Sequence, residues 1–228
     1  MKIADVEKLI ETKGLTDELF DEFKKSLKRV PKGSRCQHCY LTAYNLRSTN
    51  KSKKNLNDAV RLIEYGIENH TENDFYMRAA YEHLGMSYSA LGEYEKAKSS
   101  LRYAASIVSD DPTYIPYYAY LIVRMELHCN NFTYTPYLEE LYEQMLTADT
   151  FEAERRVNIF YRALTEIIIA DKNNSKHEKN KAYTKAFEAL NLRKPNILDS
   201  IFKRHRASHM NAVNATPEAL DFLYRNLP

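Results

Sequence analysis

Glycine, proline and tryptophan are scarce in this chain of 228 residues. It has 5 glycines, 7 prolines and no tryptophan, against usual shares of about 7% glycine and about 5% proline. So few turn-forming residues leave little room for a many-stranded sandwich or barrel, and no glycine-rich phosphate loop is present. The formal charge is only +2, from 33 basic and 31 acidic residues. No strong field of one sign therefore draws the whole chain to nucleic acid or to a membrane.

Long apolar runs and a disulfide framework are missing as well. No run of about 18 apolar residues exists, so no membrane-spanning helix is predicted. Residues 1–7 include acids where a signal peptide needs an apolar stretch. Three cysteines, an odd number, argue against paired disulfides and favour a reducing compartment. We expect a cytoplasmic protein that makes no contact with a membrane.

What the sequence does have is helical periodicity almost from end to end. Leu19, Phe20, Phe23 and Leu27 recur at the three- and four-residue steps that place side chains on one helix face. Thr16, followed by two acids, has the pattern of a helix N-cap. The periodicity predicts twelve helices, at residues 3–13, 16–30, 35–47, 55–69, 74–91, 93–108, 113–128, 136–148, 151–171, 176–191, 196–207 and 216–226.

Residues 78–111 contain the pattern of a repeating helix pair. Large and small apolar residues alternate there at fixed places of a 34-residue unit. These places hold Tyr81, Leu84, Gly85, Tyr88, Ala97, Leu101 and Ala104. The segment resembles a tetratricopeptide repeat, in which small residues let the two helices of a pair approach closely.

The resemblance extends more weakly to both sides of this unit. Upstream, Ala59, Ile63 and Gly66 occupy second-helix places, and residues 151–191 have a similar spacing downstream. The fold we expect is all-α: a right-handed superhelix of antiparallel helix pairs, with about four degenerate repeats across residues 35–195. Capping helices at residues 1–34 and 196–228 would cover the ends of the stack, and the whole would form one structural unit.

The resemblance also implies a binding surface, because proteins of this family bind partners on the face lined by first helices. The corresponding places hold His83 in the best repeat, Tyr117, Tyr120 and Arg124 in the next, and Arg155, Asn158 and Arg162 in the fourth. The version of the family that grips a C-terminal carboxylate needs lysine, arginine and asparagine there. Glu82 and Met86 do not supply these side chains in the best repeat.

Arg155, Asn158 and Arg162 form one helical stripe, because they are spaced i, i+3 and i+7. Asparagine bonds a peptide backbone through both its amide and its carbonyl, and arginine forks onto a carboxylate. Tyr117 and Tyr120 would add apolar area with a polar tip. The alternative is a solvated helix face with amphipathic tyrosines at its rim.

Cys36 and Cys39 form the one motif that suggests metal chemistry. Two thiols in a C-x-x-C pattern supply half of a tetrahedral zinc site, for which His128 and Cys129 are candidates for the other half. On a predicted helix, however, packing as small apolar groups is the favoured interpretation. No catalytic or nucleotide-binding motif occurs. We therefore predict neither enzymatic activity nor a cofactor nor a metal.

The favoured function is a non-enzymatic scaffold or adaptor that binds a protein or peptide in the concave groove of the superhelix. One alternative is a regulator that resembles bacterial peptide-responsive repeat proteins. Another is a nucleic-acid-binding protein, since residues 193–210 hold five basic residues and one acid, a net charge of +4. The amphipathic segment 217–227 is able to dock internally or to pair with a second subunit, so a dimer is one open possibility.

Overall fold

The structure is a computed structural model, and it describes residues 1–69, 74–148, 155–190 and 216–225. These residues form eleven α-helices and one 3₁₀ helix, and none of them lies in a β-strand. The predicted all-α class is therefore confirmed. The chain divides into two compact units, Met1–Ser109 and Asp110–Pro228, each with its own internal packing.

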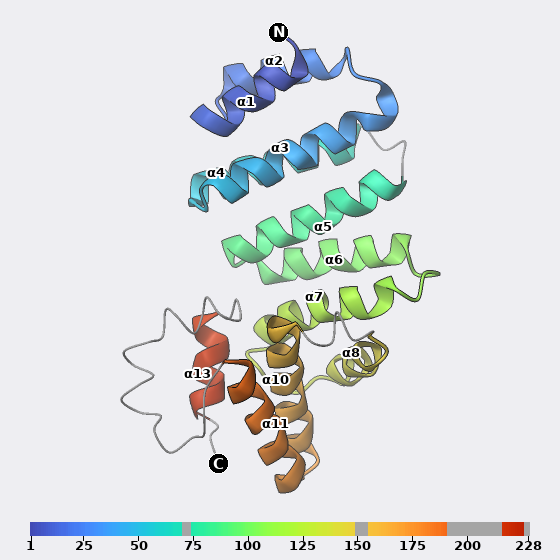
Figure 1. The fold of residues 1–228 in the computed structure, drawn as a ribbon, viewed down its shortest axis with the longest axis vertical. Coiled ribbons are helices and arrows are strands. Elements are labelled where there is room, and N and C mark those ends of the chain that lie inside the picture. Colours follow the sequence, from blue (N-terminus) through green and yellow to red (C-terminus); the bar gives the residue numbers. More distant parts are fainter. Residues whose placement is uncertain (70–73, 149–154, 191–215, 226–228) are drawn as a thin grey trace. The chain divides into compact units, whose positions relative to one another are not determined.

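The first unit is built from three successive helix pairs (Figure 1). Its helices are α1 (Ile3–Lys13), α2 (Asp17–Leu27), α3 (Arg35–Thr49), α4 (Lys53–Asn69), α5 (Asp74–Leu91) and α6 (Tyr94–Ile107), with η1 (Lys32–Ser34) before α3. Each odd-numbered helix packs against the even-numbered helix that follows it. The first helices of the pairs also lie side by side, with α3 in contact with both α1 and α5.

Local sequence signals place the helix ends of this unit. The hydroxyl of Thr16 accepts a hydrogen bond from the Leu19 amide at 3.2 Å, so the predicted N-cap of α2 is confirmed. Phe20, Phe23 and Leu27 of α2 are buried, as their spacing predicts. The connection between α3 and α4 is shorter than the sequence suggests, because both helices extend two residues further into it than predicted.

Gly85 marks a close approach between α5 and α6. A Cβ atom at this position would lie 2.7 Å from Cγ of Leu101 and 3.1 Å from the carbonyl oxygen of Ala97. Ala97 and Ala104 are fully buried, and Leu84 and Leu101 are buried as well. The predicted repeat positions therefore lie where two helices touch. Two of the repeat tyrosines are half-buried: Tyr81 packs its ring on Tyr103, and Tyr88 donates its hydroxyl to Glu64.

Gly66 has the same role between α3 and α4. A Cβ atom there would lie 2.7 Å from Cβ of Cys39 and 3.2 Å from its Sγ. Both Cys36 and Cys39 are buried in this contact. A small residue on the second helix thus faces a small residue on the first, which brings the two backbones together.

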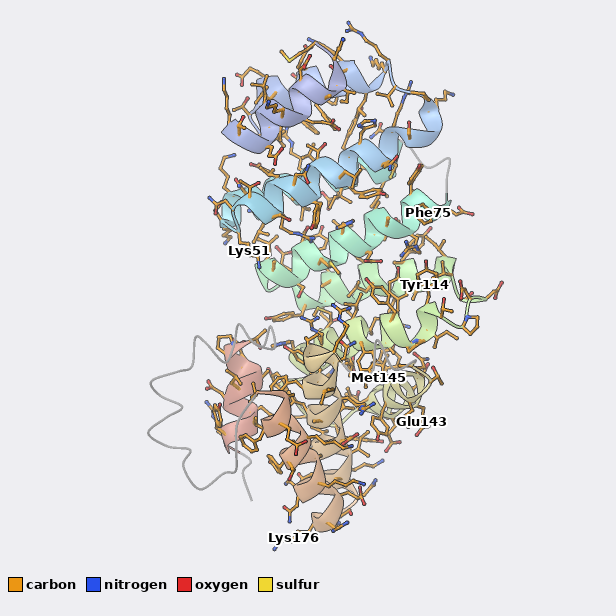
Figure 2. All side chains as sticks on the ribbon, in the orientation of Figure 1. Lys51, Phe75, Tyr114, Glu143, Met145 and Lys176 are labelled. Atoms are coloured by element: carbon orange, nitrogen blue, oxygen red, sulfur yellow. The ribbon has the colours of Figure 1, made fainter. Side chains whose placement is uncertain are left out.

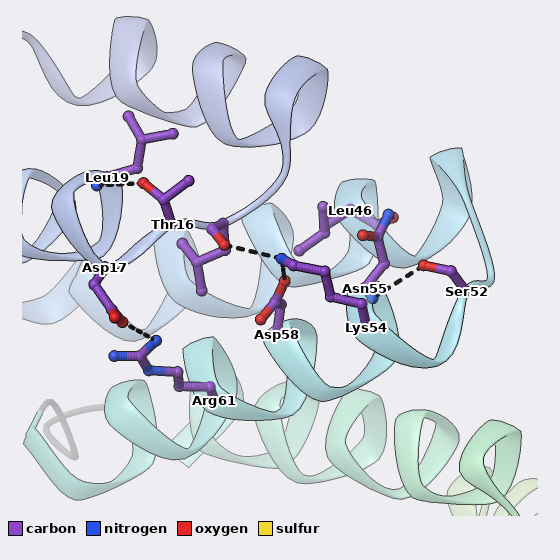
Figure 3. Close-up of polar contacts among 10 residues, drawn as sticks. Thr16, Asp17, Leu19, Leu46, Ser52, Lys54, Asn55, Asp58 and Arg61 are labelled. Carbon is purple, nitrogen blue, oxygen red and sulfur yellow. Dashed lines mark hydrogen bonds and ion pairs between the residues drawn. The ribbon is translucent and has the colours of Figure 1, made fainter.

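Polar side chains connect the start of the unit to α4 (Figure 3). The Lys54 ammonium donates to the Leu15 carbonyl oxygen at 3.0 Å. Arg61 pairs with Asp17 at 2.8 Å and lies over the Phe20 ring, 4.2 Å from its centroid. These contacts fix the turn between α1 and α2 against α4, although an exposed ion pair adds at most about 1 kcal/mol.

The second unit has two further helix pairs and a C-terminal helix. Its helices are α7 (Tyr114–Cys129), α8 (Pro136–Leu146), α10 (Arg156–Lys172), α11 (Lys176–Ala189) and α13 (Pro217–Arg225). Helix α10 packs against α7, α8 and α11. The C-terminal helix docks on the end of α7, where Phe222 stacks on Phe132 with ring centroids 5.2 Å apart and Thr216 bonds His128 at 3.0 Å.

Two helices of this unit are buried nearly all round, which differs from an open helix pair. The buried side chains of α10 cover most of its circumference; they are Asn158, Phe160, Tyr161, Ala163, Leu164, Thr165, Ile167, Ile168 and Ala170. Helix α7 is similar, with ten buried residues along its length. Among the described residues, a helix surrounded in this way leaves only a narrow strip of exposed and half-buried side chains.

Prolines begin two helices of this unit and precede a third. Pro136 and Pro217 are the first residues of α8 and α13, and Thr216 accepts a hydrogen bond from the Ala219 amide. Pro112, by contrast, precedes α7, which begins at Tyr114. There the Asp111 carboxylate accepts hydrogen bonds from the amide and the hydroxyl of Thr113. These two bonds form a local turn before the helix begins.

Several predictions concern residues outside the described part. The expected helix at 196–207, the basic segment 193–210 and residues 151–154 of the expected helix 151–171 belong to this group. The predicted division into caps at 1–34 and 196–228 around a repeat block at 35–195, as one structural unit, stays a prediction. Within the described residues, no helix combines the length and the apolar character needed to cross a bilayer.

Candidate functional site

An aromatic cluster lies between α3 and α5 around His83. The imidazole of His83 stacks on the Tyr40 ring with centroids 5.2 Å apart and an interplanar angle of 15°. Tyr44, one turn along α3, meets the same imidazole at its edge, with centroids 5.4 Å apart. Tyr40 is buried, whereas Tyr44 is 45% exposed. Two tyrosines of one helix therefore hold a histidine of the next helix pair in a fixed position.

Arg47 lies beside this cluster and connects the same two helices. Its Nη1 donates to the His83 carbonyl oxygen at 3.2 Å and to the Ser87 hydroxyl at 3.3 Å. Its Nη2 lies 3.4 Å from Nδ1 of His83 and 3.9 Å from the sulfur of Met86. The Tyr44 ring centroid is 5.9 Å from the guanidinium carbon. The guanidinium is thus held in place by the backbone and side chains of α5.

This geometry fixes the protonation state of His83. Burial and the Arg47 charge lower the pKa of His83 from 6.5 to about 4, so the ring is neutral at pH 7. A guanidinium has only donors, so Nδ1 of His83 must accept the hydrogen bond. The single ring proton then resides on Nε2, an inference that follows from the bonding pattern.

Arg47 carries a half-buried positive charge without a carboxylate beside it. In the described part of the chain, its contacts are all to neutral groups. Glu82 is close enough to act on it through space, but Glu82 is paired with Arg78 at 2.9 Å. Burial lowers the pKa of Arg47, although the guanidinium stays charged at any physiological pH.

We call the surface formed by these side chains the α3–α5 face. Its members are Tyr40, Leu41, Tyr44, Arg47, His83 and Met86. Leu41 and Tyr44, three residues apart on α3, are its exposed apolar members, at 42% and 45% exposure. Figure 2 shows Phe75 at the start of α5 and Lys51 just after α3, so that these two exposed residues mark opposite ends of the two helices.

Of the predicted binding residues, His83 is the one that the first unit contains, and it lies on this face. In the second unit Tyr120 does not lie on an open surface, because this side chain is 2% exposed and its hydroxyl donates to the Met145 carbonyl oxygen at 3.5 Å. Its ring belongs to the contact between α7 and α8. Tyr117 is half-buried with its ring against Tyr118, and Arg124 lies 5.0 Å from the centroid of the buried Tyr161 ring.

The predicted binding role of Arg155, Asn158 and Arg162 stays a prediction, but the three side chains do not form one open stripe. Arg155 is the N-cap residue of α10, so it precedes the helix, and its carbonyl accepts from the Asn158 and Ile159 amides. Asn158 is 5% exposed, and Arg162 lies 3.8 Å from the Glu166 carboxylate, which also binds Lys185 at 2.7 Å. The expectation assumed a two-layer repeat with an open face, whereas α10 is packed by three other helices.

The cysteine motif is part of the core. Burial raises the pKa of Cys36 to about 11 and raises that of Cys39 as well, so both remain thiols at pH 7. Cys39 lies against Gly66 at the α3–α4 contact. Across the described ranges, no three side chains of histidine, cysteine, aspartate or glutamate are arranged to hold a metal ion. The favoured interpretation, packing as small apolar groups, agrees with these contacts.

Sequence reasoning missed Tyr40, Tyr44 and Arg47, although the sequence contains their signal. The three residues are spaced i, i+4 and i+7 on the predicted helix at 35–47, which places them on one stripe. The 34-residue repeat pattern begins at Arg78, and the predicted helix at residues 35–47 does not fit this pattern. The pattern therefore assigned no role to these three residues. A search for aromatic and arginine residues on each first helix would have found the stripe.

Comparisons with known proteins identify no relative. No protein-family model matches the chain, and no curated protein and no solved structure matches it.

Proposed function

We propose that this protein is a non-enzymatic module that binds a segment of a partner protein on its α3–α5 face. In this proposal the first unit is a superhelical stack of the tetratricopeptide type, with α1, α3 and α5 as the helices of its binding layer. The second unit, whose α7 and α10 are surrounded by other helices, has a structural role.

The helix arrangement supports the repeat interpretation. Close contacts at Gly66 and Gly85 hold the two helices of a pair together, and the first helices of successive pairs pack side by side. In a stack of this kind each first helix presents one side to its partner helix and keeps another side for a ligand. A surface made from two such helices combines side chains that are far apart in the sequence, as Tyr44 and His83 are.

One observation carries the proposal: exposed apolar side chains and a fixed, half-buried cation lie together on the α3–α5 face. Leu41 and Tyr44 offer apolar area, and tyrosine and arginine are the residue types that dominate binding energy at protein interfaces. Arg47 and His83 are held by contacts within the unit, so little side-chain freedom is lost when a ligand binds.

The test is to select peptides on the full-length chain from a displayed random library and to measure their affinity by fluorescence polarisation. The double variant Leu41→Ala, Tyr44→Ala should weaken binding at least about tenfold, since it removes two exposed contact side chains. Leu146→Ala is the matched control, because Leu146 is 50% exposed but lies on α8. All variants should keep the helical circular dichroism spectrum. Equal affinity of the double variant and the control for every selected peptide would contradict the proposal.

Two other functions stay predictions. A peptide-responsive regulator requires that a bound peptide changes the shape of the protein, which small-angle scattering with a selected peptide measures. Binding to nucleic acid requires the basic segment 193–210, which is outside the described residues, and deletion of residues 193–228 tests it through the salt dependence of binding.

A further inference from the structure

The donors of Arg47 are unequally used. Nη1 makes two hydrogen bonds, at 3.2 and 3.3 Å, whereas Nη2 has only the longer contacts to His83 and Met86. Nε has no hydrogen-bond acceptor among the described residues, and it is not fully buried, so it reaches solvent. The Nε–Nη2 edge of a guanidinium presents two parallel N–H groups, the arrangement that matches the two oxygens of a carboxylate.

His83 provides a second donor next to this edge. Its proton is on Nε2, because Nδ1 faces the Arg47 guanidinium. Within the described part of the chain Nε2 has no acceptor either, and it is also not fully buried. Two neighbouring helices thus each carry an N–H group without an acceptor among the described residues, the Nε–H of Arg47 and the Nε2–H of His83.

The charges around the patch determine which ligand it favours. Arg78 and Glu82 form an ion pair at 2.9 Å, and His83 is uncharged. Arg47 therefore gives the patch a net positive charge. A basic or purely apolar ligand that covered Arg47 would bury this charge without compensation, which is costly. A carboxylate would compensate it and would accept a hydrogen bond from the open Nε–H group of Arg47.

We infer that the α3–α5 face binds an acidic peptide segment, in which the side-chain carboxylate of an aspartate or glutamate pairs with Arg47 and a nearby leucine or aromatic side chain packs on Leu41 and Tyr44. This inference depends on the proposed function, since it names the partner class of the same surface. The carboxylate belongs to a side chain within the segment, so the peptide needs no free C-terminus.

The test uses an array of short peptides with both ends blocked. Each member carries one glutamate and one leucine or phenylalanine at one to four positions from it, and each has a twin with glutamine in place of glutamate. Binding of the full-length protein is measured by fluorescence polarisation. We expect the best glutamate peptides to bind at least about tenfold more tightly than their glutamine twins. Raising the salt concentration should reduce this ratio.

Variants assign the preference to individual side chains. In Arg47→Met, each glutamate peptide should bind with the same affinity as its glutamine twin. Arg47→Lys should restore part of the preference for glutamate, because lysine keeps the positive charge but lacks the paired N–H groups of a guanidinium. Tyr44→Ala should weaken both peptides of a pair by a similar factor. Leu146→Ala should change neither, and circular dichroism checks that each variant is folded.

The outcomes separate the inference from the proposed function. Peptides that bind through Leu41 and Tyr44 with equal affinity for glutamate and glutamine twins would overturn the acidic segment but leave the binding face. A preference that survives in Arg47→Met would also overturn the inference. If no peptide of the array binds, or if Tyr44→Ala and Arg47→Met leave every affinity unchanged, both proposals are wrong.

Discussion

Replacing Gly85 with alanine adds one methyl group at a point where α5 and α6 touch. The new Cβ would lie 2.7 Å from Cγ of Leu101 and 3.1 Å from the Ala97 carbonyl oxygen. The usual distance between non-bonded carbons is about 3.5–4.0 Å, so the overlap with Leu101 is close to 1 Å. Leu101 is 2% exposed and the carbonyl is backbone, so neither atom can move aside without shifting a helix.

The size of the effect follows from two opposing contributions. Overpacking of a core costs about 1–3 kcal/mol, and the rigid neighbours of Gly85 favour the upper part of this range. Alanine in place of glycine gains about 1 kcal/mol of intrinsic helix stability. We therefore expect Gly85→Ala to lower the free energy of unfolding by about 1–2 kcal/mol.

Urea unfolding followed by circular dichroism measures the change. Ser99, which is exposed on α6, supplies the matched control, since Ser99→Ala compared with Ser99→Gly reports the helix contribution alone. In a Leu101→Ala background the cost of Gly85→Ala should shrink strongly, because the closest side-chain atoms are then absent. If Gly85→Ala instead stabilises the protein as much as alanine does at Ser99, the close approach of α5 and α6 is refuted.

Two further predictions concern titratable groups. Burial is the main cause that lowers the pKa of both His83 and His128 to about 4, whereas an unfolded histidine has a pKa of about 6.5. Between these values only the unfolded chain binds the extra protons, so the free energy of unfolding should fall as the pH drops from 7 to 4, by at most about 3 kcal/mol for each histidine. Urea titrations at several pH values measure this fall. In the double variant His83→Asn, His128→Asn the free energy of unfolding should depend less steeply on pH. An equally steep dependence would contradict the burial of these two neutral histidines. Cys36 and Cys39 are buried and Cys129 is half-buried. Ellman's reagent should therefore modify at most one thiol quickly in the folded protein and all three in urea. Fast modification of two thiols before unfolding would place Cys36 or Cys39 at the surface.

The helices and their contacts in the first unit were predictable because short-range signals determine them. The spacing of Phe20, Phe23 and Leu27 and the cap at Thr16 depend on neighbours within one or two turns. The Gly85 contact was predictable too, since a small residue in a helix interior costs stability unless another helix approaches it.

The surroundings of a helix were not predictable in the same way. Asn158 lies on the side of α10 opposite its most apolar residues, so its sequence position indicates exposure, yet it is buried because α7, α8 and α11 all pack around this helix. Periodicity reports how many sides of a helix are apolar, but a helix can also bury polar side chains when these find partners. Thr165, which is fully buried and donates to the Tyr161 carbonyl, is a second case.

The two glycine contacts explain why the expected repeat pattern fits one helix pair better than the other. In the α3–α4 pair the glycine, Gly66, is on the second helix and faces Cys39, whereas in the α5–α6 pair the glycine, Gly85, is on the first helix and faces Leu101. Close approach needs a small residue on either side of the contact, so the same packing tolerates different sequences. A repeat pattern with a fixed small position therefore detects one pair well and the other poorly.

The α3–α5 face is a property of two neighbouring pairs and of neither pair alone. Tyr40, Tyr44 and Arg47 come from one pair and His83 from the next, and the guanidinium is positioned by the backbone carbonyl of the second. The proposed binding on this face would therefore be coupled to the packing of α3 on α5. A substitution that separates these helices would abolish binding without touching the ligand, so each affinity measured on a variant has to be compared with its stability.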